Sequence, residues 1–191
     1  MEDKLEMIGL VRQPKTVLFG PGQRSQLPFV AKTYGKHVLV ITDERMAASD
    51  EFKNIKAGIE GHGVLVSVFD KALPDVPVST INQVVEAFGN RQTPNIDALI
   101  GIGGGSCMDL AKVVSVMMAH GGDVRDVVGE FNVPGPGLPV IQVPTTGGTG
   151  AEVTCIAVIY DDEAGMKVGV ADPNLCLLYT SPSPRDWIWH L

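Results

Sequence analysis

The sequence predicts an α/β fold in which a parallel β-sheet, covered by helices, is followed by an antiparallel β-hairpin. Runs of residues that are apolar on both faces, typical of buried parallel strands, alternate with amphipathic segments of helical period. The hairpin is indicated beyond Gly150, where the runs TCIAVIY and MKVGV flank the turn DDEAG. We expect the parallel sheet to end at about residue 143 and the hairpin at about residue 170.

Five strands are predicted before the hairpin, because each run is short, apolar and rich in β-branched residues. The run that ends in GIGGG is expected inside the sheet and not at its edge. The strands are TVLFG (16–20), HVLVITD (37–43), VLVSVF (64–69), IDALIGI (96–102) and LPVIQV (138–143).

Three helices are predicted between these strands. Ser49 is expected to cap the first helix, which Gly61 and Gly63 end. The third helix, residues 106–120, is apolar nearly all round, which predicts that it is buried. The apolar positions that define the first two helices are Phe52, Ile55 and Ile59, then Ile81, Val84, Val85 and Phe88.

The composition narrows the class of protein. A net charge of −7 gives a nucleic-acid partner no electrostatic attraction, so none is expected. Three cysteines without CxxC spacing indicate reduced thiols and a cytoplasmic location. The first residues, MEDKLEMIGL, do not have the pattern of a signal peptide, and no apolar run approaches the length of a membrane span.

The strongest functional pattern is GIGGGSCMDLAK, residues 101–112, in which a buried strand runs into three glycines and a helix. Glycines let backbone N–H groups approach a diphosphate closely, at the positive end of the helix. We expect Ser106 to cap this helix and Asp109 to be its capping-box partner, because a carboxylate would repel phosphate. The alternative is a tight turn that needs glycine for its dihedral angles alone.

Two further segments fit a nucleotide. VPTTGGTGAEVT, residues 143–154, forms a loop with many hydroxyl and amide donors for phosphates or a ribose, or else a polar crossover loop. Asp43 ends a strand and precedes the glycines, the reverse of the usual dinucleotide fingerprint. Asp43 either binds a ribose 2′-hydroxyl and repels a 2′-phosphate or caps the next turn, and for Asp43 alone capping is favoured.

Taken in order, FGPGQRSQL, GGGSCMDLAK and VPGPGLPVIQVPTTGGTGAEVT resemble the iron-containing (group III) alcohol dehydrogenase family, from Val11 to Leu175. The resemblance implies a Rossmann-like nucleotide-binding domain, followed in the family by a helical domain that we do not find in this sequence. It also implies interconversion of small alcohols and aldehydes with NAD or NADP, and Asp43 favours NAD. The resemblance is also compatible with a homo-oligomer.

The resemblance carries ten cofactor contacts onto this sequence. Asp43 corresponds to the acid that meets the adenosine ribose, and Lys167 corresponds to a lysine near the cofactor. Asp75 stands in PDVP, where many relatives have PNP with Asn as a contact, so its role is open. Gly103, Gly104, Gly105 and Ser106 correspond to the pyrophosphate loop, and Thr145, Thr146 and Thr149 to the second cofactor loop.

In the family, iron or another divalent metal is held by one Asp and three His of the helical domain. We expect the histidines of this chain to be surface or helix-end residues and not ligands. They are His37, His62, His120 and His190. The sequence therefore predicts no metal ligand, no catalytic residue and no turnover by the chain alone.

The character of the sequence changes at Cys176. CLLYTSPSPRD resembles a transposase adapter from sequencing libraries, translated in frame, so 1–175 is predicted as the domain and 176–191 as a non-native tail. This tail is expected to be unpacked, or packed only through Trp187 and Trp189. The alternative is a genuine C-terminus.

Other functions stay open at this point. A glycerol dehydrogenase, dehydroquinate synthase or maleylacetate reductase relative shares the predicted architecture, although PTTGGTGAEVT favours the alcohol dehydrogenase branch. A nucleotide-binding module without catalysis describes the same residues. Thr154 and Ile156 share one strand face and are expected to line the substrate cleft.

Overall fold

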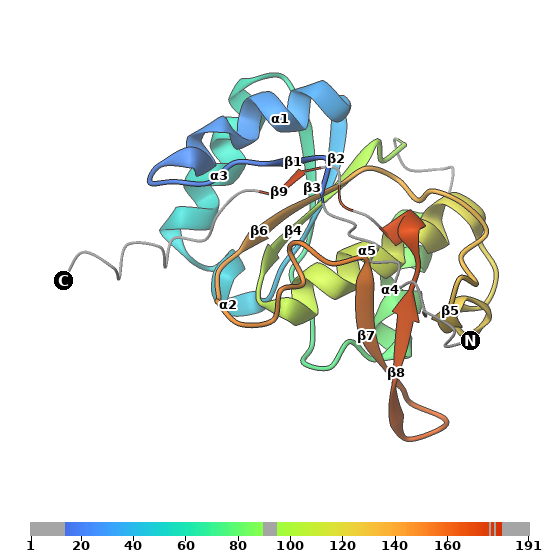
Figure 1. Cartoon of the computed structure of the whole chain (residues 1–191). Helices are drawn as coiled ribbons and strands as arrows, with labels where there is room; N and C mark the ends of the chain where they lie inside the picture. Colours follow the sequence, from blue (N-terminus) through green and yellow to red (C-terminus); the bar gives the residue numbers. More distant parts are fainter. Residues whose placement is uncertain (1–13, 90–94, 176, 178, 181–191) are drawn as a thin grey trace, which may run out of the picture.

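The computed structural model describes residues 14–89, 95–175, 177 and 179–180 of the 191-residue chain (Figure 1). Its larger sheet has the strand order β1-β9-β6-β4-β2-β3, and every pairing in that sheet is parallel. The strands are β1 (Thr16–Val17), β2 (His37–Ile41), β3 (Leu65–Phe69), β4 (Ala98–Gly103), β6 (Val140–Pro144) and β9 (Tyr179–Thr180). The predicted parallel sheet is confirmed, and β4 lies inside it as expected.

Helices cover both faces of this sheet (Figure 1). One face packs against α1 (Leu27–Tyr34) and α3 (Asp50–Gly61), and the other against α4 (Val78–Phe88) and α5 (Gly105–His120). The shorter helical elements are η1 (Gln23–Gln26), α2 (Glu44–Ala47), η2 (Val124–Val127) and η3 (Pro173–Leu175).

Strand β2 shows why the central strands are apolar without alternation. Leu39 and Ile41 belong to the core on the α5 side, whereas Val38 and Val40 belong to the core on the α1 side. All five residues of β2 are buried. A strand with cores on both faces favours apolar side chains at successive positions, which is what the run VLVI indicated.

The predicted caps were partly right. The Ser49 hydroxyl accepts a hydrogen bond from the Phe52 N–H at 3.1 Å, so it caps α3 as expected.

His37, expected near the surface, is buried at 6% exposure, and its Nε2 lies 2.9 Å from the Ser67 Oγ. The prediction for His37 is wrong because the ring lies in β2, with a hydroxyl partner on the neighbouring strand β3.

The predicted hairpin is confirmed. Strands β7 (Ile156–Asp161) and β8 (Met166–Ala171) pair antiparallel, and β5 (Gly129–Glu130) adds a parallel strand beside β8. The Arg125 guanidinium donates to both carboxylate oxygens of Asp161 at 3.2 Å and so ties η2 to the hairpin. Among the described residues, no helix has the length and apolar character needed to cross a membrane.

The sheet continues beyond residue 143, where it was predicted to end, and beyond residue 175, the predicted end of the domain. Tyr179 pairs with Ile141 on β6 and with Thr16 on β1, so β9 lies between these strands. Leu177 is 1% exposed. The expectation of no packing after residue 175 is therefore wrong for residues 177, 179 and 180. The other residues of 176–191, including Trp187 and Trp189, lie outside the described part of the chain.

The position of β9 predicts the effect of truncation. A chain that ends at Leu175 loses the strand between β1 and β6 and the buried Leu177 side chain, whereas a chain that ends at Thr180 keeps both. Burial of one leucine contributes about 2 kcal/mol, so the shorter chain should unfold roughly 5 °C lower. Differential scanning calorimetry of the two truncations measures this, and equal midpoints would show that β9 adds no stability.

Candidate functional site

The ends of three adjacent parallel strands place the predicted site residues along one edge of the sheet. Asp43 follows β2, the glycine turn follows β4, and Thr145 follows β6. The Thr145 N–H donates to the Gly103 carbonyl at 2.9 Å, so the loops after β4 and β6 are joined by a backbone hydrogen bond. Ligands of open parallel sheets bind at the carboxyl ends of the strands, and this edge is therefore the candidate site.

The glycine turn requires glycine for two reasons, its backbone conformation and the close approach of neighbouring side chains. Gly103 has φ +150°, which residues with a Cβ rarely adopt, and a Cβ there would lie 2.5 Å from the Cys107 Sγ. A Cβ on Gly105 would lie 2.9 Å from the Thr149 Cγ2, and one on Gly104 would lie 3.3 Å from the Thr146 Oγ1. The turn and the threonine loop are thus packed against each other.

Helix α5 begins earlier than predicted. Gly104 is its N-cap residue and Gly105 its first residue, so Ser106 lies inside the first turn and is not the cap. No side chain of the described residues caps this helix end. The prediction is wrong because the strand enters the helix directly through Gly104. The amides of the first helical turn therefore lack an intrahelical partner and can donate to an anion.

Asp109 also differs from the expectation. Its Oδ2 accepts a hydrogen bond from the Val158 N–H at 3.0 Å, and its Oδ1 lies 3.2 Å from the Lys112 Nζ. Asp109 therefore connects α5 to β7 and is no capping-box partner of Ser106.

Asp43 caps α2, as the simpler of its two interpretations predicted. Its Oδ1 accepts from the Met46 N–H at 2.8 Å, and its Oδ2 lies 3.9 Å from the Cys107 Sγ. Burial, with a smaller contribution from the Asp43 charge, raises the pKa of the Cys107 thiol to about 12. A Cβ on Gly103 would lie 3.7 Å from the Asp43 Oδ2, so the carboxylate lies beside the glycine turn.

One pocket of about 330 Å³ brings four of the predicted residues together from distant parts of the chain. They are Asp75, Ser106, Thr149 and Lys167, and the pocket is also lined by Thr154 and Ile156, which were expected to line a cleft. Asp43 lines a different pocket of about 510 Å³, together with Arg45 and Lys71. Neither pocket is lined by Gly103, Gly104, Gly105, Thr145 or Thr146.

Lys112 is a structurally important residue that was not among the residues predicted from the sequence. Its side chain is completely buried, and its Nζ donates to the Ile156 carbonyl at 2.7 Å as well as to Asp109. Burial lowers the pKa of the Lys112 amine and raises that of the Asp109 carboxyl group, and each charge partly opposes the shift of the other. The available signal was one cation in a helix that is otherwise apolar nearly all round, three residues after an acid.

The described residues contain no group of three or more His, Cys, Asp or Glu side chains that is able to hold a metal ion. His62 and His120 lie at helix ends, as expected, and their ring nitrogens donate hydrogen bonds to the carbonyls of Gly58 and Pro136. Asp186 and His190 do have the four-residue spacing of the family's first two ligands. Both lie outside the described residues.

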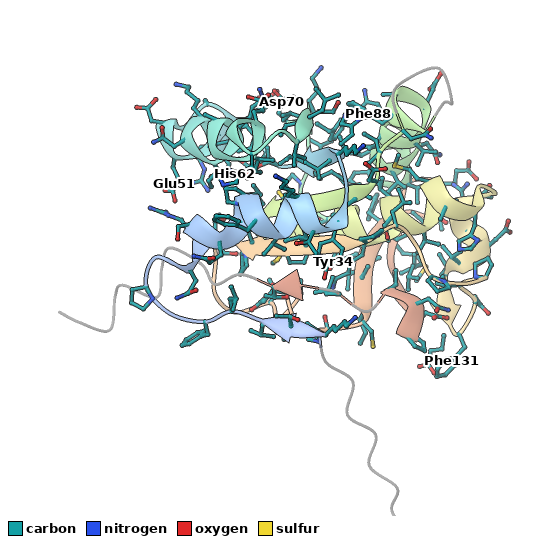
Figure 2. The ribbon with its side chains drawn as sticks, turned by 90° about the horizontal axis from the view of Figure 1, so that it is seen from above. Tyr34, Glu51, His62, Asp70, Phe88 and Phe131 are labelled. Carbon is teal, nitrogen blue, oxygen red and sulfur yellow. The ribbon has the colours of Figure 1, made fainter. Side chains whose placement is uncertain are left out.

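The outer face of the hairpin exposes apolar side chains. Ile156 and Val158 are 47% and 44% exposed, and Phe131 is 69% exposed at the margin of the molecule (Figure 2). A groove of about 330 Å³ runs past Phe131, Val153 and Ile156. We call the surface formed by Phe131, Val153, Ile156 and Val158 the outer hairpin face. Large exposed apolar patches are commonly covered by another domain or a partner.

Comparisons with known proteins match the chain to one family. A family model described as iron-containing alcohol dehydrogenase matches residues 14–178. The chain is 33% identical to the NAD-dependent methanol dehydrogenase of Bacillus methanolicus, covering 85% of this chain and 42% of that protein. It is 38% identical to long-chain-alcohol dehydrogenase 1 of Geobacillus thermodenitrificans, covering 82% and 42%.

Solved structures agree with this match. An alcohol dehydrogenase from Oenococcus oeni superposes with a TM-score of 0.84 and 28% identity, covering 91% of this chain and 45% of that structure. The chain therefore spans less than half the length of the proteins that it matches.

The burial of Lys112 predicts a large effect of its substitution. Lys112→Met removes the charge and leaves the Asp109 carboxylate without its partner, and unpairing a buried ion pair costs about 3 kcal/mol or more. Lys53 and Asp50 have the same three-residue spacing at the surface, so Lys53→Met should change stability by less than about 0.5 kcal/mol. Urea unfolding measures the free energy of unfolding of both variants and of the wild type. Equal effects would contradict the proposed link between α5 and β7.

The thiol of Cys107 predicts a pH dependence. Its pKa is about 12 in the folded chain against 9.0 for the ordinary group, so its stabilising contribution is full below pH 9 and declines as the pH rises toward 12. Between pH 8 and pH 10 the wild-type chain should lose about 1 kcal/mol more unfolding free energy than Cys107→Ala. Cys155→Ala keeps Cys107 and should retain the wild-type dependence. If the unfolding free energies of the wild type and Cys107→Ala changed equally with pH, the raised pKa of Cys107 would be refuted.

Proposed function

The chain belongs to the iron-containing alcohol dehydrogenase family, and on this basis we propose that it is the cofactor-binding part of an NAD-dependent alcohol dehydrogenase. The observation that carries the proposal is the glycine turn after β4, packed against the threonine loop after β6. Such a turn offers backbone donors at a helix N-terminus to a diphosphate, with no Cβ in the way.

Each predicted contact has a proposed part in holding the cofactor. Gly103, Gly104, Gly105 and Ser106 hold the diphosphate, and Thr145, Thr146 and Thr149 hold the neighbouring ribose or phosphate. Asp43 accepts from an adenosine ribose, and Lys167 and Asp75 lie toward the nicotinamide side. When bound, NAD supplies the acceptor for a hydride from the alcohol carbon. The residues of this chain bind and orient the cofactor.

Asp43 is the residue that we propose favours NAD over NADP. The Met46 N–H holds the Asp43 Oδ1, and the Oδ2 lies beside the glycine turn. We propose that a ribose at the end of β2 meets this oxygen. A 2′-phosphate there would meet a like charge. Arg45 and Lys71 line the same pocket, and they oppose this discrimination to the extent that they reach the phosphate.

The catalytic metal of the family does not fit the described residues, which hold no suitable group of ligands. We therefore assign no step of the reaction to a metal in this chain. The relatives named above are about twice as long as this chain, and we propose that the metal and most of the alcohol pocket belong to that further length. In this proposal, the outer hairpin face packs against it.

Two further aspects follow from the same proposal. The substrates are small alcohols and aldehydes, as for the relatives named for them. The cysteines Cys107 and Cys155 are free thiols, which favours a reducing compartment, and we place the protein in the cytoplasm. The chain taken by itself acts as a nucleotide-binding module, and this second candidate is favoured by the lack of metal ligands in its described part.

The test is an isothermal titration of the chain with NAD, with Gly104→Ala as the variant. The new methyl group lies 3.3 Å from the Thr146 Oγ1 and in the path of the diphosphate, so affinity should fall at least about tenfold. Gly61→Ala is the control, because nothing lies within 4 Å of its new Cβ. No NAD binding by the wild type, or equal binding by both variants, would overturn the proposed site. Alcohol turnover on addition of ferrous or zinc ion would overturn the proposal that the metal site lies outside this chain.

A further inference from the structure

Asp75 and Lys167 form an ion pair across the pocket that Ser106 and Thr149 also line. The Asp75 Oδ1 lies 2.8 Å from the Lys167 Nζ. Asp75 belongs to the connection between β3 and α4, and Lys167 belongs to β8, so the pair joins two segments distant in sequence. The geometry points to Asp75 as a specificity-determining residue that occupies Lys167 and so disfavours ligands with added negative charge. This inference deepens the proposed function and rests on it for the identity of the ligand.

The backbone at Asp75 has an unusual conformation. Asp75 and Val76 both have positive φ angles, +64° and +53°, which is rare for residues with a Cβ and rarest for a β-branched one. Val76 is nevertheless held there, because its side chain is buried at 1% exposure and its carbonyl accepts from the Tyr160 N–H at 3.0 Å. Strained backbone of this kind persists only where its surroundings enforce it, and it is concentrated at functional positions.

The pair contributes little to folding. Both side chains are more than half exposed, at 54% and 58%, and exposed ion pairs of this kind stabilise proteins weakly. The ion pair matters instead because it neutralises the positive charge of Lys167 in the pocket. Asp and Asn are the residues other than glycine that best tolerate positive φ. The position therefore accepts either an acid or its neutral amide, and this chain has the acid.

The charges that line the pocket leave no free cation. Among its lining residues in the described part of the chain, Asp75 and Asp109 are acidic and Lys167 is basic. Asp109 has its own partner, the buried Lys112, and Lys167 is held by Asp75. An anionic group of a substrate that approaches Lys167 must displace the Asp75 carboxylate or lie beside it. An uncharged alcohol or aldehyde meets neither cost, so uncharged substrates are the class that the pocket favours.

The experiment compares Asp75→Asn with Asp70→Asn in the full chain. Asp70→Asn removes the same charge from an exposed residue in the same connection, and Asp70 does not line the pocket. Each variant is titrated with inorganic pyrophosphate, as a small anion, and with NAD. Asp75→Asn should bind pyrophosphate about threefold more tightly than the wild type, with the gain lost in high salt. Asp70→Asn should bind like the wild type.

A second variant identifies Lys167 as the residue that is released. Asp75→Asn combined with Lys167→Gln should lose the gain in affinity for pyrophosphate. Failure of Asp75→Asn to exceed Asp70→Asn, or a gain that survives Lys167→Gln, overturns the inference. A tighter pyrophosphate complex together with no binding of NAD by any variant would leave the role of Asp75 in place and refute the proposed function instead.

Discussion

The arrangement of the site depends on a steric constraint at the end of β4. No side chain fits at Gly103 or Gly105, because a Cβ there would overlap Cys107 or Thr149. The absence of side chains lets the strand enter α5 without a connecting loop, and it lets the threonine loop close over the turn. The same two glycines therefore set the start of the most buried helix and the spacing of the loops that we propose hold the diphosphate.

The position of α5 in turn fixes the hairpin. Lys112 is buried among apolar side chains, and it is tolerated there because the Ile156 carbonyl and the Asp109 carboxylate satisfy its ammonium group. Asp109 then accepts from the Val158 N–H, so two side chains of α5 bond the backbone of β7. These hydrogen bonds connect the helix that follows the glycine turn to the hairpin, and residues of both line the same pocket.

Features set by local pattern were predictable from the sequence, and features set by distant contacts were not. The central strands were predicted because both of their faces are buried, which leaves a continuous apolar run. Helix α1 was missed because it is short and buries only Leu27 and Ala31. The site residues came from motifs and resemblance. Their pairing did not, since nothing in the sequence indicates that Asp75 contacts Lys167, or that Ser106 lies one residue inside the helix.

Strand β7 is apolar on both faces, but the described residues cover only one of them. Ala157 and Ile159 are fully buried on the inner face, whereas Ile156 and Val158 on the outer face are apolar and exposed. A half-exposed strand of an antiparallel sheet normally alternates apolar and polar residues, and a strand that is apolar on both faces is normally covered on both. The proteins that this chain matches extend well beyond the matched region. These exposed apolar residues support the proposal that the outer hairpin face is one side of an interface, with the other side in a region that corresponds to the further length of the relatives.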